Sequence, residues 1–281
     1  MSYRIGIIGL GLMGASLAGA LHGFKNARIA GADVSEGVCV KAKQAGFVDE
    51  AYVDAGDAIH GADLIIFCVY ARHIPRLISE NALCFKTGSV VSDICGVKSE
   101  LYAKLRGLLP EHVDYVGIHP MTGKERDGID NADPAIYKNS GMIICPLPSS
   151  KPEDIALMKD IAEYIGVTRL ATSPPGEHDS VIAYTSDLMH IAAAGLCVEF
   201  HAGMTSAFAA GAFRDCTRIA NINPEAWTEL LMDNRSHTLA RLNEYIGSLQ
   251  TIRRSLADGD KTLLYSLLDK AGRNKRKMLA R

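Results

Sequence analysis

The sequence predicts an α/β protein with two domains: a doubly wound, mostly parallel sheet in residues 1–173 and an all-helical domain in residues 174–281. Short apolar runs alternate with helical segments through the first half, which is the pattern of crossover units in a parallel sheet. Strand-like patterns stop at Pro174-Pro175-Gly176, where Pro and Gly interrupt the chain. A length of 281 residues also exceeds that of most single domains.

The elements of the first half follow in regular order. Short apolar segments predict strands at 3–8, 28–33, 64–69, 89–93, 115–118, 142–145 and 168–170. Segments with helical periodicity lie between them, at 12–21, 35–44, 74–83, 97–109 and 152–165. Residues 119–134 form a long polar stretch, and loops of that length in compact domains are usually functional. We therefore expect part of a site in this stretch.

The second half carries Ala, Leu, Met and charged residues at helical spacing through to Arg281. Its first helix, expected at 177–201, has few charges after Asp187, so it should be buried on most sides. Burial on that scale needs a partner surface. A second copy of the chain would supply one, and twofold dimers are the commonest soluble oligomers, so we expect a homodimer.

Composition excludes several classes of protein. Hydrophobic residues make up 48% and charged residues 22%, the balance of an ordinary globular protein. A formal net charge of -2 argues against a nucleic-acid partner or an anionic membrane surface. No uninterrupted apolar run reaches the ~18 residues of a membrane span. Seven cysteines, an odd number with no C-x-x-C pair, indicate reduced thiols in a cytoplasmic protein rather than disulfides or a metal site.

The strongest local motif is G-x-G-x-x-G, formed by Gly9, Leu10, Gly11, Leu12, Met13 and Gly14. The first glycine of such a motif permits a tight turn, the second lets a pyrophosphate approach the backbone, and the third lets a helix pack on a strand. Here the motif follows a predicted strand, opens a predicted helix and precedes Asp33 at the end of the next strand, as a Rossmann-type dinucleotide site requires. The alternative, a glycine-rich turn without a ligand, does not account for this context.

Asp33 also indicates which dinucleotide binds. Its carboxylate would accept hydrogen bonds from ribose hydroxyls and repel a 2′-phosphate, and no Arg or Lys occurs between Asp33 and Lys41 to offset it. We therefore expect NAD as the cofactor. Val69-Tyr70 lies at the end of the predicted strand 64–69, and Ser92-Asp93 ends the predicted strand 89–93. Both pairs should lie at the carboxyl edge of the sheet, where ligands of such folds bind, so we expect them near the nicotinamide.

Several segments, taken together and in this order, resemble the prephenate dehydrogenase family. They are D-I-C-G-V-K at 93–98, G-I-H-P-M-T-G at 117–123, E-H-D at 177–179, S-D-L-M-H at 186–190 and F-R-D-C-T-R-I-A at 213–220, with Pro224 and Trp227 behind them. The resemblance covers nearly the whole chain, and H-P-x-x-G and R-D-x-T-R-x-A are far more specific than the glycine motif. It implies NAD-dependent oxidative decarboxylation of prephenate, a dicarboxylate, to 4-hydroxyphenylpyruvate on the route to tyrosine.

The resemblance implies roles for three residues. His119 would take the proton of the ring hydroxyl while the hydride goes to NAD, since an imidazole pKa of about 6.5 lies near working pH. Arg218 would bind a substrate carboxylate through two parallel hydrogen bonds. His190 would contact the substrate side chain. From the residues alone, His119 could equally be a packed or loop histidine, and His190 could be a core histidine of an apolar helix.

Further residues are expected at the substrate. Ser186 and Asp187 precede His190 by four and three residues, so we expect all three on one helix face. Glu125 matches a family glutamate in the long loop, where it would form an ionic gate with a neighbouring Arg, or else be a solvated loop charge.

Gly96 departs from the family pattern. Relatives often carry a Ser there, whose hydroxyl touches the reacting alcohol and the base. Either Ser92, Thr122 or a water replaces that hydroxyl, or His119 is oriented differently.

Asp187 is the second departure, because relatives often carry His or Gln at this position. A carboxylate there could pair with the ammonium of arogenate, the amino analogue of prephenate, and would repel the side-chain carboxylate of prephenate. Asp187 could also face solvent or hold His190. Arogenate is therefore an alternative substrate, with prephenate slightly favoured.

Two other functions fit part of the sequence. A 3-hydroxyacid dehydrogenase also joins a glycine-motif domain to a helical one, but it would use a catalytic Lys on a helix, and residues 176–201 contain no convincing candidate. A nucleotide-sensing protein could keep the fold without the chemistry. The presence of His119, His190 and Arg218 together argues against a sensor, and reduction of NAD, rather than its binding alone, would distinguish the two.

Overall fold

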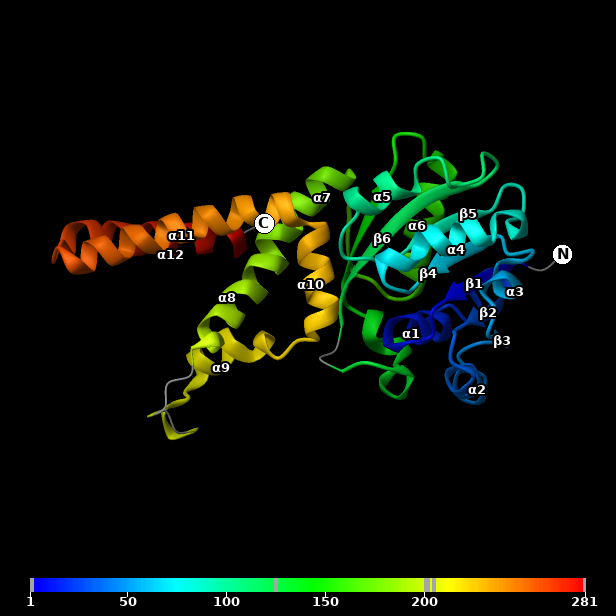
Figure 1. The fold of residues 1–281 in the computed structure, drawn as a ribbon, viewed down its shortest axis with the longest axis horizontal. Coiled ribbons are helices and arrows are strands. Elements are labelled where there is room, and N and C mark those ends of the chain that lie inside the picture. The colour runs from blue at the N-terminus through cyan, green and yellow to red at the C-terminus, as the bar shows by residue number, and fades with distance from the viewer. Residues whose placement is uncertain (1–2, 124–125, 200–202, 204–205, 280–281) are drawn as a thin grey trace.

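The computed structural model describes residues 3–123, 126–199, 203 and 206–279. It has two parts (Figure 1): a sheet covered by helices on both faces, and a helical half from which a long hairpin of two helices projects. The predicted fold class, a mostly parallel sheet followed by an all-helical half, is confirmed.

The sheet has eight strands in the order β3-β2-β1-β4-β5-β6-β7-β8. Neighbouring strands are parallel except for β6 and β7, which are antiparallel. The strands are β1 Arg4–Ile8, β2 Arg28–Ala32, β3 Glu50–Tyr52, β4 Leu64–Phe67, β5 Val90–Asp93, β6 Asp114–Met121, β7 Gly141–Pro146 and β8 Arg169–Thr172. The strand order reverses beside β1 and β4, and ligands of such sheets bind at the carboxyl ends of the strands near this point.

Helices cover both faces of the sheet because successive strand residues point to opposite sides. Ile66 of β4 belongs to one apolar cluster, whereas its neighbours Ile65 and Phe67 belong to the other. The first cluster is covered by α1, α2 and α6, and the second by α3, α4 and α5. These helices are α1 Leu12–Ala20, α2 Glu36–Gln44, α3 Ala55–Ile59, α4 Ile74–Glu80, α5 Ser99–Leu105 and α6 Pro152–Tyr164.

Several element boundaries differ from the prediction. The short elements β3 and α3 were not predicted, because segments of three and five residues carry too little periodicity. Strand β6 runs on to Met121, since β7 pairs with it as far as Gly141, so His119 lies inside a strand rather than beyond its end. The predicted polar loop also contains two short 3-10 turns, Ile129–Asn131 and Pro134–Tyr137.

The second half is helical throughout its described residues. A first, continuous helix consists of α7 Pro175–Ile182, a π turn Ala183–Asp187 and α8 Leu188–Val198. The others are α9 Gly211–Thr217, α10 Pro224–Asp233, α11 Arg235–Ala257 and α12 Lys261–Leu279. Helices α11 and α12 form the projecting hairpin (Figure 1).

The first helix of this half is less buried in the single chain than the sequence predicted. The helix Pro175–Val198 is 24 residues long, and its most apolar 18-residue window has a mean hydropathy of 1.5 with 28% of that window buried. By length and composition it could cross a bilayer, although polar residues such as Asp187 and His190 interrupt it, so it contains no uninterrupted apolar run of ~18 residues. It nevertheless buries polar side chains, His178, Asp179 and Asp187, against the rest of the protein.

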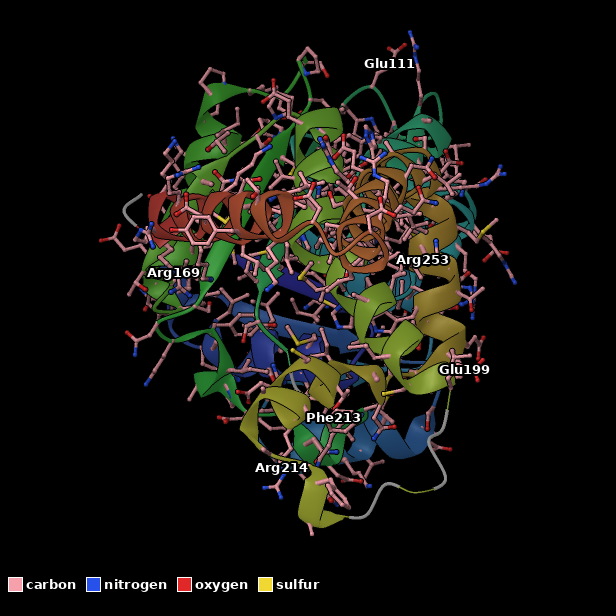
Figure 2. The ribbon with its side chains drawn as sticks, turned by 90° about the vertical axis from the view of Figure 1, so that its left-hand side faces the viewer. Glu111, Arg169, Glu199, Phe213, Arg214 and Arg253 are labelled. Carbon is pink, nitrogen blue, oxygen red and sulfur yellow. The ribbon has the colours of Figure 1, made fainter. Side chains whose placement is uncertain are left out.

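Figure 2, which faces the helical half, shows α9 and its residue Arg214 at the outer edge.

The glycine motif forms the turn between β1 and α1. Gly9 has a φ of 97°, and a Cβ there would lie 2.6 Å from the carbonyl oxygen of Cys68. A Cβ at Gly14 would overlap the carbonyl oxygen of Gly9. At Gly11, by contrast, a Cβ would meet nothing within 4 Å. The first and third glycines are therefore required by the fold, whereas the second keeps space open on the ligand side.

These contacts separate stability from cofactor binding. Gly14→Ala should lower the free energy of unfolding by about 1 to 3 kcal/mol, because its methyl group cannot fit without moving the turn. Gly11→Ala should cost less than about 1 kcal/mol but weaken NAD+ binding roughly tenfold, because the methyl group occupies the approach of the pyrophosphate. Thermal unfolding and titration calorimetry with NAD+ would measure both effects. Equal losses of stability in the two variants would contradict this assignment.

Candidate active site

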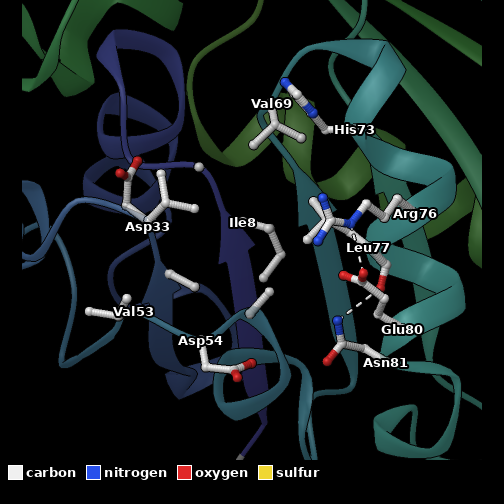
Figure 3. A pocket seen from close by; sticks show the side chains of 14 residues that line it. Ile8, Asp33, Val53, Asp54, Val69, His73, Arg76, Leu77, Glu80 and Asn81 are labelled. Carbon is white, nitrogen blue, oxygen red and sulfur yellow. Dashed lines mark hydrogen bonds and ion pairs between the residues drawn. The ribbon is translucent and has the colours of Figure 1, made fainter.

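A pocket of about 490 Å³ opens beside the glycine turn at the carboxyl edge of the sheet (Figure 3). Asp33 lies on its wall, and its two carboxylate oxygens accept hydrogen bonds from the backbone amides of Leu10 and Ser35, both at 3.0 Å. Helix α4 supplies the facing wall, where Arg76 pairs with Glu80 at 2.7 Å. The fold therefore brings the guanidinium of Arg76 to the same pocket as Asp33, which the local sequence did not indicate. Glu80 already pairs with this guanidinium.

The four residues expected near the nicotinamide divide into two pairs. Val69 lines this first pocket and also a second one of about 150 Å³, which Tyr70 lines as well. Ser92 and Asp93 are fully buried below the sheet edge. The Ser92 hydroxyl donates to a main-chain carbonyl of β6 at 2.6 Å, and Asp93 accepts internal hydrogen bonds. Neither side chain lines these pockets.

The third cavity is a cleft of about 1450 Å³. It adjoins the second pocket at Ala226 of α10, which lines both. Its walls come from β6, the loop that follows β6, the long apolar helix and the turn after α9. It brings together His119, Thr122, Ser186, His190 and Arg218, all predicted for the substrate site. Glu125 lies outside the described residues.

Helix α10 lines both the second pocket and the cleft. Arg72, which follows β4, pairs with Glu225 at 2.9 Å and with Glu229 at 2.6 Å. Lys104 of α5 lies 3.6 Å from Asp233 at the other end of α10. Such exposed pairs contribute only about 0 to 1 kcal/mol each, so they orient α10 over the first half rather than hold the two halves together.

His119 lies opposite Ile143 of β7, with its ring at the wall of the cleft. Protein encloses most of the ring, and this desolvation lowers the pKa of His119 well below its usual 6.5. The positive charge of Lys98 and the neighbouring His178 lower the pKa further, against a smaller opposite effect of Asp179. His119 is therefore neutral at pH 7, as a histidine that accepts a proton must be.

Two residues that the sequence left without a role lie directly behind His119. Nδ1 of His119 is 2.9 Å from Nε2 of His178, and Nδ1 of His178 is 2.7 Å from Oδ1 of Asp179. His178 and Asp179 are both 1% exposed. The E-H-D segment marked them as part of the family pattern, but no local spacing indicates that α7 places them against β6.

A fully buried lysine stabilises the strand end that carries His119. Nζ of Lys98 donates to Oδ1 of Asp93 at 2.6 Å and to the carbonyl oxygen of Ile118 at 2.7 Å. The adjacent Gly117 leaves room for this cluster, since a Cβ there would lie 2.7 Å from Oδ2 of Asp93. A buried cation needs acceptors of this kind, because an unpaired one would cost several kcal/mol.

His190 stacks on Trp227 of α10, with 3.6 Å between the ring centroids. Its Nδ1 lies 3.0 Å from the carbonyl oxygen of Ser186, so Nδ1 carries the hydrogen and Nε2 is left as an acceptor. Burial lowers the pKa of His190, and the nearby Arg218 lowers it further. His190 is therefore a neutral, oriented side chain in the cleft.

Asp187 does not share a face with the cleft residues, so this prediction is wrong. It is fully buried, and its Oδ2 accepts hydrogen bonds from Asn234 at 2.8 Å and from Thr238 of α11 at 2.9 Å. Asp187 ends the π turn, whose extra residue rotates the side chains relative to an α-helix. Burial raises the pKa of Asp187. Its carboxylate therefore does not line the cleft, where it could have met a substrate ammonium.

Gly96 lies beside the base. A Cβ there would lie 3.7 Å from Nε2 of His119 and 3.1 Å from a methyl group of Leu230. A side chain at this position would therefore reach the ring nitrogen of His119 that faces the cleft. Of the two residues predicted as substitutes, Thr122 lines the cleft but donates its hydroxyl to a main-chain carbonyl at 3.0 Å, and Ser92 is buried inside the sheet.

The chain matches two family models in succession. Residues 17–170 match the nucleotide-binding domain of prephenate dehydrogenase, and residues 174–270 match the prephenate dehydrogenase dimerization domain. These matches confirm the predicted dehydrogenase class with NAD as its cofactor, and they argue against the 3-hydroxyacid alternative.

Characterised relatives agree with the family models. A cyclohexadienyl dehydrogenase of Zymomonas mobilis is 31% identical over 92% of this chain and 90% of its own length. A prephenate dehydrogenase of Bacillus subtilis is 28% identical over 94% of this chain and 73% of its own length.

Solved structures share the fold. The prephenate dehydrogenase from A. aeolicus, in complex with hydroxyphenyl propionate and NAD+, has a TM-score of 0.87 at 23% identity, with 98% of each chain covered. The arogenate dehydrogenase of Synechocystis has a TM-score of 0.83 at 26% identity, with 98% of this chain and 99% of its own covered. The matches to both domains, the relatives and the shared fold together establish that this chain belongs to the prephenate dehydrogenase family.

Proposed function

We propose that the chain catalyses the NAD-dependent oxidative decarboxylation of prephenate to 4-hydroxyphenylpyruvate, with release of CO2 and NADH, in the synthesis of tyrosine. The observation that supports this function best is the position of His119. It is a neutral, largely enclosed imidazole on the wall of the cleft that contains Arg218, beside Gly96 of the second pocket.

The residues of the cleft suit the reaction. NAD+, when bound, accepts the hydride from the ring carbon that carries the hydroxyl. His119 takes the hydroxyl proton at Nε2, so a carbonyl forms at that carbon. The new dienone then draws electrons from the bond to the ring carboxylate, CO2 leaves, and the ring becomes aromatic.

The other cleft residues would hold the substrate. Arg218 lies at the cleft and would bind one of the two carboxylates through paired hydrogen bonds. Ser186, His190 and Thr122 line the same space and would contact the remainder of the substrate. The family resemblance implies that Glu125 would form an ionic gate with a neighbouring Arg.

Arogenate is the second candidate substrate. Asp187 no longer supports it, but His190 does, because its Nε2 is left as a hydrogen-bond acceptor that suits an ammonium group. The names of two similar proteins, a cyclohexadienyl and an arogenate dehydrogenase, also keep this alternative open.

The active protein would be a cytoplasmic homodimer. The dimerization domain of the family spans the helical half, and this half exposes large apolar side chains in the single chain. They include Leu196, Val198, Leu249, Leu256, Tyr265 and Leu268. All seven cysteines are free thiols, which agrees with a reducing compartment.

The substrate assignment predicts a direct assay. Purified protein should reduce NAD+ with prephenate faster than with arogenate at matched concentrations, measured as NADH absorbance. His119→Asn should lower kcat by roughly 100- to 10,000-fold with little change in KM, because it removes a base and not a binding group. His112→Asn, at an exposed histidine, is the matched control. Faster turnover of arogenate would reverse the substrate order, and no reduction with either substrate would refute the proposed function.

The lowered pKa of His119 predicts the acid limit of activity. The neutral form is active, so activity is lost as pH falls through a pKa that lies well below 6.5. A plot of kcat/KM for prephenate should therefore stay level through pH 6.5 and decline only at lower pH. Samples held at low pH and assayed again at pH 8 would control for unfolding. An acid limb centred at or above about 6.5 would contradict the enclosed, neutral base.

The buried position of Asp187 predicts that it does not select the substrate. Asp187→Asn should leave the ratio of kcat/KM for prephenate and arogenate within about twofold of the original. It should keep or raise the melting temperature, because it removes a buried charge whose Oδ1 has no hydrogen-bond partner among the described residues. Asp187→Ala should lower the melting temperature, since it strands two buried donors. A tenfold change in the substrate ratio in Asp187→Asn would restore Asp187 as a specificity residue.

A further inference from the structure

We propose that His178 and Asp179 are a positioning pair for His119. The pair determines which ring nitrogen of each histidine carries a hydrogen, and it leaves Nε2 of His119 bare and directed at the cleft. This inference rests on the proposed role of His119 as the base.

Both carboxylate oxygens of the buried Asp179 have hydrogen-bond partners. Oδ1 of Asp179 accepts the backbone amide of Lys98 at 2.9 Å and faces Nδ1 of His178 at 2.7 Å, while Oδ2 accepts the backbone amide of Ser99 at 2.8 Å. Burial raises the pKa of Asp179, but the hydrogen bonds from His178, Ser99 and Lys98 outweigh it and leave the pKa below its ordinary value. Asp179 is therefore a carboxylate, which can only accept hydrogen bonds.

The state of the carboxylate determines the state of both rings. Because Asp179 is an acceptor, Nδ1 of His178 must carry a hydrogen, and in a neutral ring Nε2 is then an acceptor. Nε2 of His178 faces Nδ1 of His119 at 2.9 Å, so Nδ1 of His119 must donate. Nε2 of His119 is then the unprotonated nitrogen. It is also the nitrogen nearest to the position that a side chain at Gly96 would occupy, beside the cleft.

The pair also receives the charge that the reaction creates. When the substrate O–H bond breaks and a bond forms between that proton and Nε2 of His119, the ring becomes cationic close to the buried Lys98. The Nδ1 proton of His119 can then pass to Nε2 of His178, which breaks one N–H bond and forms another. The positive charge moves from beside Lys98 to beside the Asp179 carboxylate, at 2.7 Å. The hydride goes to NAD+, so no other oxidant is needed.

The charged and titratable groups around His119 come from three elements. Lys98 lies at the start of α5, His178 and Asp179 lie on α7, and Asp93 ends β5, where it pairs with Lys98. Of these, Asp179 alone raises the pKa of His119, whereas desolvation, Lys98 and His178 lower it. Without the pair, protonated His119 would be disfavoured by its burial and by the positive charge of Lys98, with no carboxylate to offset them.

A purely structural role must be separated from this one, because Asp179 also accepts the first amides of α5. Nitrogen NMR of protein labelled with 15N at histidine reads the hydrogen on each ring nitrogen directly. The His119 signals are assigned from their loss in His119→Asn. We expect the tautomer with hydrogen on Nδ1 and a bare Nε2, both in the free protein and with NAD+ bound. A hydrogen on Nε2 of His119 in the free protein at pH 8 would overturn the proposal.

Kinetics of two substitutions at position 178 give the second test. In His178→Gln the side-chain amide can still accept from Nδ1 of His119, whereas His178→Leu offers no acceptor. We expect kcat to fall roughly 100-fold or more in His178→Leu and clearly less in His178→Gln, with KM and NAD+ affinity nearly unchanged in both. His112→Gln is the matched control at an exposed histidine. Equal kcat values for folded Gln and Leu variants would overturn the proposal, and the NMR test stands if His178→Leu does not fold.

The NMR test is independent of the proposed function. The tautomer of His119 is measured without any substrate. If the protein reduces NAD+ with neither prephenate nor arogenate, the proposed function fails while the NMR result still decides the hydrogen-bond chain. If turnover is normal and Nε2 of His119 carries the hydrogen, the positioning pair fails and the function stands.

Discussion

The site depends on one buried cation. Lys98 contacts three elements at once: its ammonium group binds Asp93 at the end of β5 and the carbonyl oxygen of Ile118 on β6, and its backbone amide binds Asp179 on α7. The residue after Ile118 is His119. The side-chain ion pair therefore aligns the strand that carries the base, and the backbone contact attaches the helical half to the same point. Next to these contacts, His119 lines the cleft, and Gly96, whose Cβ position would lie 3.7 Å from Nε2 of His119, lines the second pocket.

Long and periodic segments of the fold could be predicted from the sequence. The glycine turn, the parallel strands and the change to helices after Pro175 each have a local signal, and Gly9 and Gly14 are required where the turn packs on itself and on Cys68 after β4. The signal was too weak for β3 and α3, which are short. The end of β6 depends on its pairing with β7, so local sequence could not show that His119 lies inside the strand.

The candidate site was partly predictable for the same reason. His119, His190 and Arg218 lie in specific motifs, and the structure brings them to one cleft. The roles of Asp187 and of the His178–Asp179 pair depend on packing between helices far apart in the sequence. Asp187 turns toward Asn234 through a π turn, and His178 reaches His119 across 59 positions of the chain. Spacing within one helix contains no information about such contacts.

The buried cluster around Lys98 also restricts how this protein can evolve. Removing one partner of a buried ion pair leaves an uncompensated charge and costs about 3 to 5 kcal/mol, whereas replacing both partners with apolar groups can be neutral. Drift at Asp93 and Lys98 therefore requires coupled changes, and single steps pass through an unstable protein. Asp93 is fully buried and lines none of the three pockets, so it has no direct contact with a ligand there. If both positions are invariant across species, the cause would be this mutual dependence and not ligand binding.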